Sequence, residues 1–455
     1  MADYYSYIQA SVIVCIMGYL ALLWILRRDG ASLGLPFAYL SLLLVNHVPG
    51  AFVQLVDDQF YPHASEVEIG IRFTAIGTVF FVLGVWLARA RDIDARKYVT
   101  IPTPLMTFEE DHSYWIFCLV GGLVATFGLA SLRYLPSIGA LVVNGGAIWM
   151  LGAVLGLRWS VREGNLLGIL MWLAALSVYP AMIFITAGFL SYGTTAVLVG
   201  VCALAISARR VLPVLVVIVV VSYLGLSLFS NYFQARDNIR AVIWSGATTA
   251  ESVAAISQIA TDFKLFDTSD ELALTGLDIR LNQNYFVGLA AENIENGSVE
   301  YVYGRSVSDA ILALVPRALW PNKTVYGGSP KVVGEFTGLN LDLDTSFGIG
   351  NVMEFYVNFG IPGVIAGFLG LGWLLGRFDQ RAALAVTRRD YASATIYFLP
   401  AVGLIQPIGS MVEMAGSAGS AWIAAFLWNF LWARWQDRAA ESKRLAGLAS
   451  DSGLT

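Results

Sequence analysis

The chain has 455 residues, of which 57% are hydrophobic and only 13% are charged, and its mean hydropathy is +0.66. Because a soluble domain carries about a quarter charged residues, this composition excludes an ordinary soluble protein. Apolar runs of about 20 residues, long enough to cross a membrane as a helix, recur along most of the length. They predict an all-α polytopic membrane protein. The net charge of −5 says little by itself, because its distribution between loops matters more.

The apolar runs predict eleven membrane spans. They lie near residues 7–26, 34–55, 69–88, 114–132, 137–157, 166–186, 189–207, 211–230, 352–376, 392–411 and 418–435. The fifth run is interrupted by Asn144, Gly145 and Gly146. Irregular backbone at membrane depth is tolerated where it lines a cavity, so we interpret this run as a weak span or a broken helix of that kind.

Basic residues divide the predicted loops between two sides of the membrane. The basic segments contain Arg27/Arg28, 89–97, 158–164, Arg209/Arg210, 377–390 and 434–444. They alternate with loops that hold few cations, as the positive-inside rule requires of cytoplasmic loops. We therefore expect the N-terminus outside and the C-terminus in the cytoplasm, which requires an odd number of spans.

This topology divides the chain into four regions. They are an N-terminal bundle of about eight spans (1–230), a large external loop (231–351), three C-terminal spans (352–436) and a cytoplasmic tail (437–455). The loop holds eight Lys/Arg and fourteen Asp/Glu, and its apolar spacing predicts helices over 248–263, 270–294 and 306–315. We expect Gly276 to weaken the second helix, and Ser306 and Pro316 to begin and end the third.

Neither a metal nor a cofactor is indicated. Cys15, Cys118 and Cys202 each lie in an apolar run, where cysteine usually serves as a small buried hydrophobe. The chain contains no CxxC pair, no phosphate-binding P-loop and no strand-borne GxGxxG motif. His47, inside the second span, is expected either to be a hydrogen-bonded core residue or to have a function.

The strongest functional signal is a set of arginines on the predicted external side of the membrane, where the positive-inside rule does not explain them. These residues are Arg72, Arg133, Arg236, Arg240, Arg280, Arg305 and Arg317. Arg236 and Arg240 are four residues apart and would share one side of a helix. Guanidinium groups suit a pyrophosphate, because each can donate two hydrogen bonds to anionic oxygens. The alternative for a single arginine is a snorkelling or salt-bridged side chain. For the set, we predict an anion site at the membrane surface.

Carboxylates supply the other half of a transfer site. Glu354 lies at the external mouth of the ninth span, where a carboxylate is costly unless it is paired or hydrated. Glu335, Glu413 and Asp278 are further candidates. The alternative for all four is a structural pairing with the arginines.

Two stretches carry a resemblance to a known family. The segment "LVPRALWPNK" (314–323), followed by "TSFGIGNVMEFYVNFGIPGVIAGFLGLGWLLGR" (345–377), resembles the C-terminal half of bacterial Wzy-type oligosaccharide repeat-unit polymerases. The predicted span number, orientation and large external loop also fit these polymerases. The resemblance implies an integral-membrane glycosyltransferase of the C type (GT-C-like) in the bacterial inner membrane, with its active site on the periplasmic face.

The resemblance also implies substrates and roles. The donor and the acceptor would both be oligosaccharides linked to undecaprenyl pyrophosphate, with a chain-length regulator and a flippase as partners, membrane lipid around the protein and no nucleic acid. We expect Glu354, or else Glu335, to act on the acceptor hydroxyl, with Arg317 as a further catalytic residue. The expected pyrophosphate-binding residues are Arg236, Arg240, Arg280, Arg317, Lys323, Arg133 and Arg72. The expected sugar-stacking residues are Trp320, Tyr301 and Tyr303.

Three alternatives compete with a polymerase. An O-antigen ligase-like enzyme would use the same donor and a different acceptor. A transporter or flippase would need ionisable groups near the middle of the membrane and paired broken helices. The third alternative is a structural subunit of an assembly complex.

Overall fold

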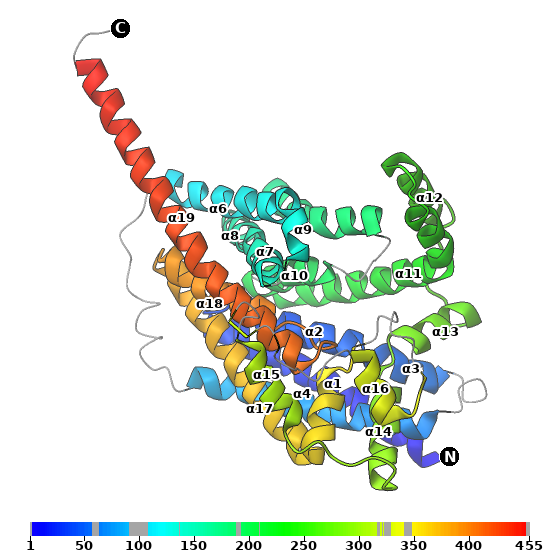
Figure 1. Ribbon diagram of the computed structural model, residues 1–455. Coiled ribbons are helices and arrows are strands. Elements are labelled where there is room, and N and C mark those ends of the chain that lie inside the picture. The colour runs from blue at the N-terminus through cyan, green and yellow to red at the C-terminus, as the bar shows by residue number, and fades with distance from the viewer. Residues whose placement is uncertain are drawn as a thin grey trace.

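The computed structural model describes residues 2–56, 63–90, 108–135, 137–187, 193–208, 210–315, 319–320, 322, 329–340 and 348–451. Within these ranges the chain is helical and forms no strand (Figure 1). The N-terminal helices are α1 (Ala2–Asp29), α2 (Leu35–Val45), α3 (Val48–Val56), α4 (Ala64–Ala90), α6 (Phe108–Leu123), α7 (Ile138–Gly146), α8 (Ile148–Glu163), α9 (Leu166–Ala187), α10 (Thr194–Ser207) and α11 (Val211–Trp244). A π-helical turn, η1 (Val124–Gly128), and a 3-10 turn, η2 (Ala130–Tyr134), follow α6.

The remaining helices form the loop region and the C-terminal part. They are α12 (Thr249–Thr261), α13 (Glu271–Arg280), α14 (Gln283–Glu295), α15 (Arg305–Ala313), α16 (Ser329–Thr337), α17 (Asn351–Thr387), α18 (Tyr391–Gly403) and α19 (Met411–Asp451). Helix α17 is interrupted at Phe359 and Gly360, whose backbone angles are not helical. Gly360 has a φ of +66°, which favours glycine, and Pro362 follows it.

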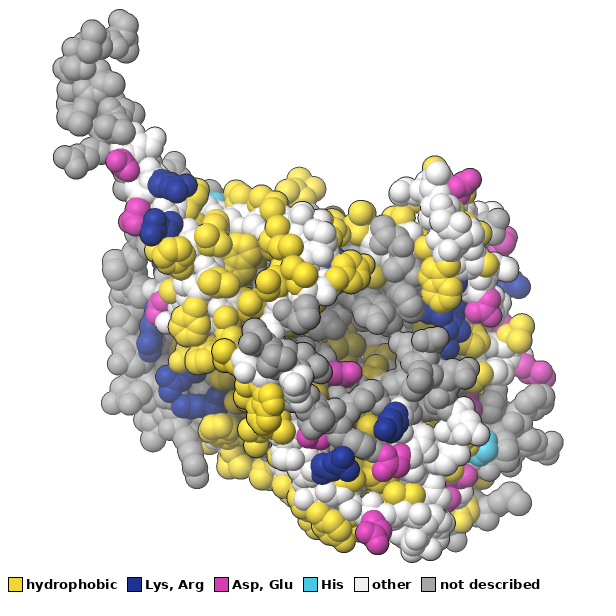
Figure 2. Space-filling view, viewed as in Figure 1, with side chains coloured by type: hydrophobic (Ala, Val, Ile, Leu, Met, Phe, Trp, Pro, Cys, Tyr) yellow, Lys and Arg dark blue, Asp and Glu magenta, His cyan; other side chains and the backbone are white. Residues whose placement is uncertain are grey.

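The protein is a polytopic membrane protein. Among the described residues, seven helical segments are long and apolar enough to cross a membrane: Tyr4–Asp29, Leu35–Val56, Ala64–Ala90, Ile138–Glu163, Leu166–Ile185, Leu215–Trp244 and Asn351–Thr387. Two shorter apolar helices, His112–Gly128 and Thr194–Ser207, accompany them. Large apolar side chains on the outside of α9 and α11, including Leu167 and Leu212, are exposed as a lipid-facing surface requires. Figure 2 shows hydrophobic side chains over much of the upper left of one face, whereas charged side chains lie along its left edge, on its right side and in its lower part.

Helix α4 lies at the centre of the bundle, where it packs against α1, α14 and α17. Its contact with α17 depends on small residues that let the two backbones approach closely. A Cβ atom on Gly372 would lie 2.2 Å from the Phe81 carbonyl oxygen, and one on Gly84 would lie 2.2 Å from the Leu369 carbonyl oxygen. Small residues at helix contacts are how helices associate where lipid removes the hydrophobic driving force.

Buried charges join several helices at one end of the bundle, which we call the basic end. The Arg89 guanidinium lies 2.8 Å from an Asp29 carboxylate oxygen and 2.5 Å from an oxygen of Asp379, which is fully buried. Asp379 also accepts hydrogen bonds from the Leu33 amide and the Ser32 hydroxyl. This network connects the α1–α2 turn to α4 and α17. It also shows that basic segments predicted to share one side of the membrane do meet in space.

The opposite end carries α12 to α16, and we call it the loop end (Figure 1). Here the linker between α13 and α14 is inserted into the break between α2 and α3. The Asn284 amide group donates to the His47 carbonyl at 2.6 Å, and its oxygen lies 2.7 Å from His47 Nδ1. The Gln283 amide donates to the Asn46 carbonyl at 3.0 Å. His47 is therefore a buried, hydrogen-bonded residue, the first of its two expected roles.

Several expectations need correction. The helix expected over 270–294 is two helices, because the chain turns at Leu281 and Asn282 and not at Gly276. Gly276 instead allows α13 to approach α11, since a Cβ there would lie 2.7 Å from the Phe233 ring. Helix α11 continues through the expected boundary at residue 230 as far as Trp244. Helix α18 ends at Gly403, eight residues before the expected end of that span.

Other expectations are confirmed. The expected loop helices at 248–263 and 306–315 correspond to α12 and α15, although Gly304, and not Ser306, lies at the N-cap of α15. The fifth predicted span is broken at Ala147, between α7 and α8, and the break lines a cavity. Pro316 lies outside the described residues.

Candidate functional site

Helix α11 carries two of the predicted pyrophosphate-binding arginines beyond the apolar part of its length. A helix of 34 residues is about 50 Å long, whereas the hydrocarbon core of a bilayer is about 30 Å thick. Arg236 and Arg240 lie in its last turns, one helical turn apart, and the structure thus places them on a rigid helix and not in a loop. The Arg240 guanidinium also lies over the Trp244 ring, 5.5 Å from its centre.

Helix α13 brings Arg280 to the same place. The helix begins at Asp270, whose side chain caps it by accepting from the amides of Leu272 and Ala273. Burial, and next the nearby charges of Arg236 and Arg240, lower the pKa of Arg280. Three arginines separated by 44 residues in sequence therefore lie within electrostatic reach of one another. We call Arg236, Arg240 and Arg280 the arginine group.

Like charges repel, so gathering them costs free energy in the absence of an anion. The one ion pair between Arg236 and a carboxylate of the described chain is with Asp237, at 3.8 Å, and the Asp237 side chain is 94% exposed. Such an exposed contact contributes little to stability. An arrangement of this kind can bind an anion with several negatively charged oxygens.

The other predicted cations lie elsewhere. Arg72, on α4, lies 3.6 Å from Glu68 one turn earlier, which is the salt-bridged alternative considered for single arginines. Arg133, in η2, lines a cavity apart from the arginine group. Arg317 and Lys323 lie outside the described residues. The structure thus brings together three of the seven predicted pyrophosphate-binding residues.

Glu354 is buried in the first turn of α17, at the loop end. One of its carboxylate oxygens accepts a hydrogen bond from the Met411 amide, at the start of α19, at 2.6 Å. The turn between α18 and α19 is held against α17 by two backbone hydrogen bonds, from Gly350 to Ile408 and from Asn351 to Pro407, each 2.9 Å. The Ser306 side chain also hydrogen-bonds to this carboxylate. The carboxylate is therefore held by one backbone amide and one hydroxyl, and no ion pair with an arginine of the described chain holds it.

The turn of α17 just before its break joins the start of this helix to residues 302–306. Asn358, one turn after Glu354, accepts from the Gly304 amide at 3.0 Å and donates to the Ser306 hydroxyl at 2.7 Å. The Val302 amide donates to the Val357 carbonyl at 2.9 Å. This network positions residues 301–306 across the start of α17.

The predicted sugar-stacking tyrosines lie in this network. The ring centres of Tyr301 and Tyr303 are 6.0 Å apart, and the ring planes meet at 60°. Tyr303 is 73% exposed and has a φ of +45°, a conformation that costs a non-glycine residue free energy. An exposed aromatic ring held in this way could stack on a sugar. Trp320 is half exposed.

Glu335 does not share a site with Glu354. It lies exposed on α16, which packs against α14 through the buried Val333 and Phe336. The Asn293 amide group donates to the Phe336 carbonyl at 2.8 Å and fixes this contact. Of the two carboxylates proposed to act on an acceptor hydroxyl, Glu354 alone has a restrained environment.

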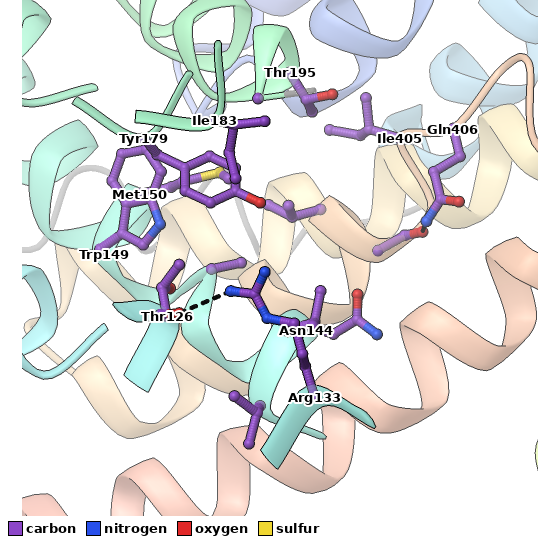
Figure 3. Close-up of a pocket in the computed structure, with 16 residues that line it drawn as sticks. Thr126, Arg133, Asn144, Trp149, Met150, Tyr179, Ile183, Thr195, Ile405 and Gln406 are labelled. Carbon is purple, nitrogen blue, oxygen red and sulfur yellow. Dashed lines mark hydrogen bonds between the residues drawn. The ribbon is translucent and has the colours of Figure 1, made fainter. Parts of the chain in front are cut away.

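A cavity of about 530 Å³ opens beside these elements (Figure 3). Its walls come from η1, the α7–α8 break, α9, the start of α10 and the turn after α18. Arg133 points into it and donates to the Thr126 carbonyl at 3.2 Å. Gln406 lines the cavity, while Met411 in the same turn contacts Glu354, so this turn separates the cavity from the carboxylate.

Sequence reasoning missed Asn351, Asn358 and Gln406. Asn351 and Asn358 flank Glu354 at helical spacing, on one face of α17, and this spacing was a usable signal. Asn351 accepts from the Tyr39 hydroxyl at 2.6 Å. Asn144 lines the cavity, as the interruption of the fifth apolar run indicated, but Gln406 reaches it only in the folded protein, and no local pattern indicates Gln406.

No family model, no curated protein and no solved structure matches the chain. Among the described residues, no group of three or more His, Cys, Asp or Glu side chains is arranged to hold a metal ion.

Proposed function

We propose that this protein is a membrane glycosyltransferase that joins lipid-linked oligosaccharide repeat units, using undecaprenyl pyrophosphate as the carrier, at the periplasmic face of the bacterial inner membrane. The observation that carries the proposal is the arginine group. Two arginines near the end of the long helix α11 and a third on α13 supply the positive charge that a pyrophosphate at the membrane surface would need.

The residues of the site support a division of roles. The acceptor hydroxyl oxygen attacks the anomeric carbon of the donor chain, and the bond from that carbon to the pyrophosphate oxygen breaks. The arginine group stabilises the charge that develops on the leaving pyrophosphate. Glu354 receives the hydroxyl proton, and burial in a restrained position suits a general base. The C-type fold, the eleven-span topology and the partners named above belong to this proposal.

A transporter of a lipid-linked sugar is the second candidate, because the structure contains discontinuous helices. The breaks between α2 and α3, between α7 and α8, and within α17 resemble the interrupted helices that form transporter sites. Against this candidate, the buried charges of Arg89, Asp29 and Asp379 are paired with one another at the basic end.

Deletion of the gene, followed by analysis of lipid-linked glycans, tests the proposal. Loss of the polymerase predicts accumulation of single repeat units on their lipid carrier at the periplasmic face. Loss of a transporter would leave the same units on the cytoplasmic face. Full-length chains missing only their final attachment would indicate a ligase, and an unchanged glycan pattern would contradict all three functions.

A further inference from the structure

The cavity around Arg133 has a chemistry that differs from that of the arginine group. It combines one cation with two amide side chains and aromatic walls. The Asn144 amide nitrogen donates to the Ser420 hydroxyl at 2.8 Å, and the Gln406 amide nitrogen donates to the Gly403 carbonyl at 2.8 Å. These bonds orient both amides. In the part of the chain that the structure describes, no hydrogen bond reaches the side-chain oxygen of either residue.

Arg133 has no carboxylate partner within the described ranges, and its single hydrogen bond is to the Thr126 carbonyl. In Figure 3 its guanidinium points toward the space below Tyr179, and Asn144 lies beside it. Trp149 and Tyr179 contribute aromatic surface to the lining. The cavity therefore offers donors from Arg133, acceptors from Asn144 and Gln406, and aromatic rings.

The local fold builds this arrangement. A Cβ atom on Gly146 would lie 2.5 Å from the Thr126 hydroxyl, so glycine at the α7–α8 break lets η1 approach. The Trp428 ring nitrogen donates to the Gly145 carbonyl at 2.8 Å and holds the break against α19. The cavity is thus braced by neighbouring helices.

A pyrophosphate does not fit this chemistry well. It accepts hydrogen bonds and carries several negative charges, whereas here one cation is accompanied by two acceptor oxygens that would repel it. Sugar hydroxyls, by contrast, can donate to the amide oxygens, and a sugar ring can pack on an aromatic side chain. One carboxylate on such a sugar would complement the single charge of Arg133. A cavity of about 530 Å³ is within the usual size range for small ligands.

We infer that this cavity binds a negatively charged sugar residue, of the hexuronic acid class, in the repeat unit. The inference rests on the proposed function, because it names a substrate component of that enzyme. Arg133 binds the carboxylate, and Asn144 and Gln406 accept from the hydroxyls.

Direct binding to the purified full-length protein in lipid nanodiscs tests this inference without requiring any turnover. The probes are methyl β-D-glucuronide, methyl β-D-glucoside and inorganic pyrophosphate, and saturation-transfer NMR with titration reports binding. We expect saturable binding of the glucuronide, and binding about tenfold weaker for the glucoside and for the glucuronide with Arg133→Met. Arg434→Met, which removes an exposed arginine of α19 outside the cavity, is the matched control and should bind like the wild type.

A second variant distinguishes a loss of binding from a loss of folding. Asn144→Asp keeps the size of the side chain and adds a negative charge, and the Ser420 hydroxyl, which accepts from Asn144 in the wild type, can turn to donate to the carboxylate. This variant should weaken glucuronide binding and leave glucoside binding unchanged. Absence of saturable glucuronide binding to wild-type protein, or equal binding in all three variants, would overturn the inference. Pyrophosphate that competes with the glucuronide in an Arg133-dependent way would overturn it too, whether or not the protein is a polymerase.

Discussion

The two ends of the helix bundle use arginine in opposite ways. At the basic end, Arg89 is buried between the carboxylates of Asp29 and Asp379. Arg27 there donates to the Ala208 carbonyl at 2.7 Å, and Arg158 to the Ser32 carbonyl. At the loop end, Arg280 is instead close enough to Arg236 and Arg240 for their charges to lower its pKa, in addition to the effect of burial.

This difference separates charges that hold the fold together from charges that serve a ligand. A buried ion pair has its attraction satisfied within the protein, and removing one partner leaves an uncompensated buried charge. A group of like charges repels itself, and an anion that arrives from outside relieves this repulsion. The same substitution, arginine to methionine or leucine, should therefore have opposite effects on stability at the two ends.

The largest effect is expected for Arg89→Leu. It leaves the buried carboxylate of Asp379 without its cation, at a cost of about 3–5 kcal/mol. We expect little or no folded protein in detergent, measured by size-exclusion chromatography of a fluorescent fusion. Asp237→Asn at the loop end is the control and should behave like the wild type. A well-folded Arg89→Leu protein would show that this network is not what joins α4 and α17.

Glu354→Gln should abolish most of the activity and leave the fold intact. The amide keeps an oxygen that can accept from the Met411 amide but cannot take a proton from an acceptor hydroxyl. Loss of a general base typically lowers the rate by about 10²–10⁴-fold. The measurement is chain lengthening by purified protein with lipid-linked repeat units. Glu335→Gln is the control, and a larger loss in that variant would move the base to α16.

Arg280→Met should reduce activity by about 10²–10³-fold and at the same time raise the melting temperature of the ligand-free protein. The reason for the second effect is the removal of a charge that is disfavoured first by burial and then by the nearby charges of Arg236 and Arg240. Thermal unfolding in detergent measures it. Arg240→Lys sharpens the test, because a point charge cannot replace the forked donor, and activity should fall although the charge remains. A fall in melting temperature for Arg280→Met would contradict the like-charge account.

The smallest effect concerns pH at the loop end. Burial raises the pKa of Asp278, although hydrogen bonds from Asn282 and Gln54 oppose the change. Since the folded state binds this proton more tightly than the unfolded state, stability should increase as the pH falls through the raised pKa toward about 3.9, the unfolded value. Asp278→Asn should remove this increase and raise the melting temperature at neutral pH by roughly 1–2 °C.

Asp267→Asn provides the matched comparison for Asp278. Hydrogen bonds from the Ser269 amide, and next from its side chain, lower the pKa of the exposed Asp267. The contribution of Asp267 to stability should therefore decrease as the pH falls, opposite to that of Asp278. Its substitution should not stabilise the protein. If the melting temperature depended on pH in the same way in both variants, the result would contradict the effect assigned to the burial of Asp278.

Local patterns in the sequence were sufficient for much of the fold. Apolar runs predicted the membrane class and most long helices, and helical spacing predicted α12 and α15. The turn between α13 and α14 was missed because its cause is distant: Asn284 and Gln283 bond to the α2–α3 break, over 230 residues earlier. The early end of α18 likewise follows from the pairing of its following turn with Gly350 and Asn351.

The candidate site was predictable in part for the same reason. Arg236 and Arg240 lie on one helix, so their spacing indicated their association, and the sidedness rule marked Arg280 as unusual. Arg280 joins them because α13 docks on α11. Arg133 and Arg72 lie on other elements, and no local pattern in the sequence distinguishes them from Arg280. The buried network of Arg89, Asp29 and Asp379 had no local signature, because its members come from three separate helices.

Incubation of the purified wild-type protein with a single lipid-linked repeat unit, which serves as both donor and acceptor, tests the central claim most directly. We predict a ladder of chain lengths with release of the pyrophosphate-bearing carrier. We predict no ladder with the Arg280→Met protein, once thermal unfolding has shown that this variant is folded. Unchanged repeat units with wild-type protein, or an equal ladder with Arg280→Met, would contradict the account.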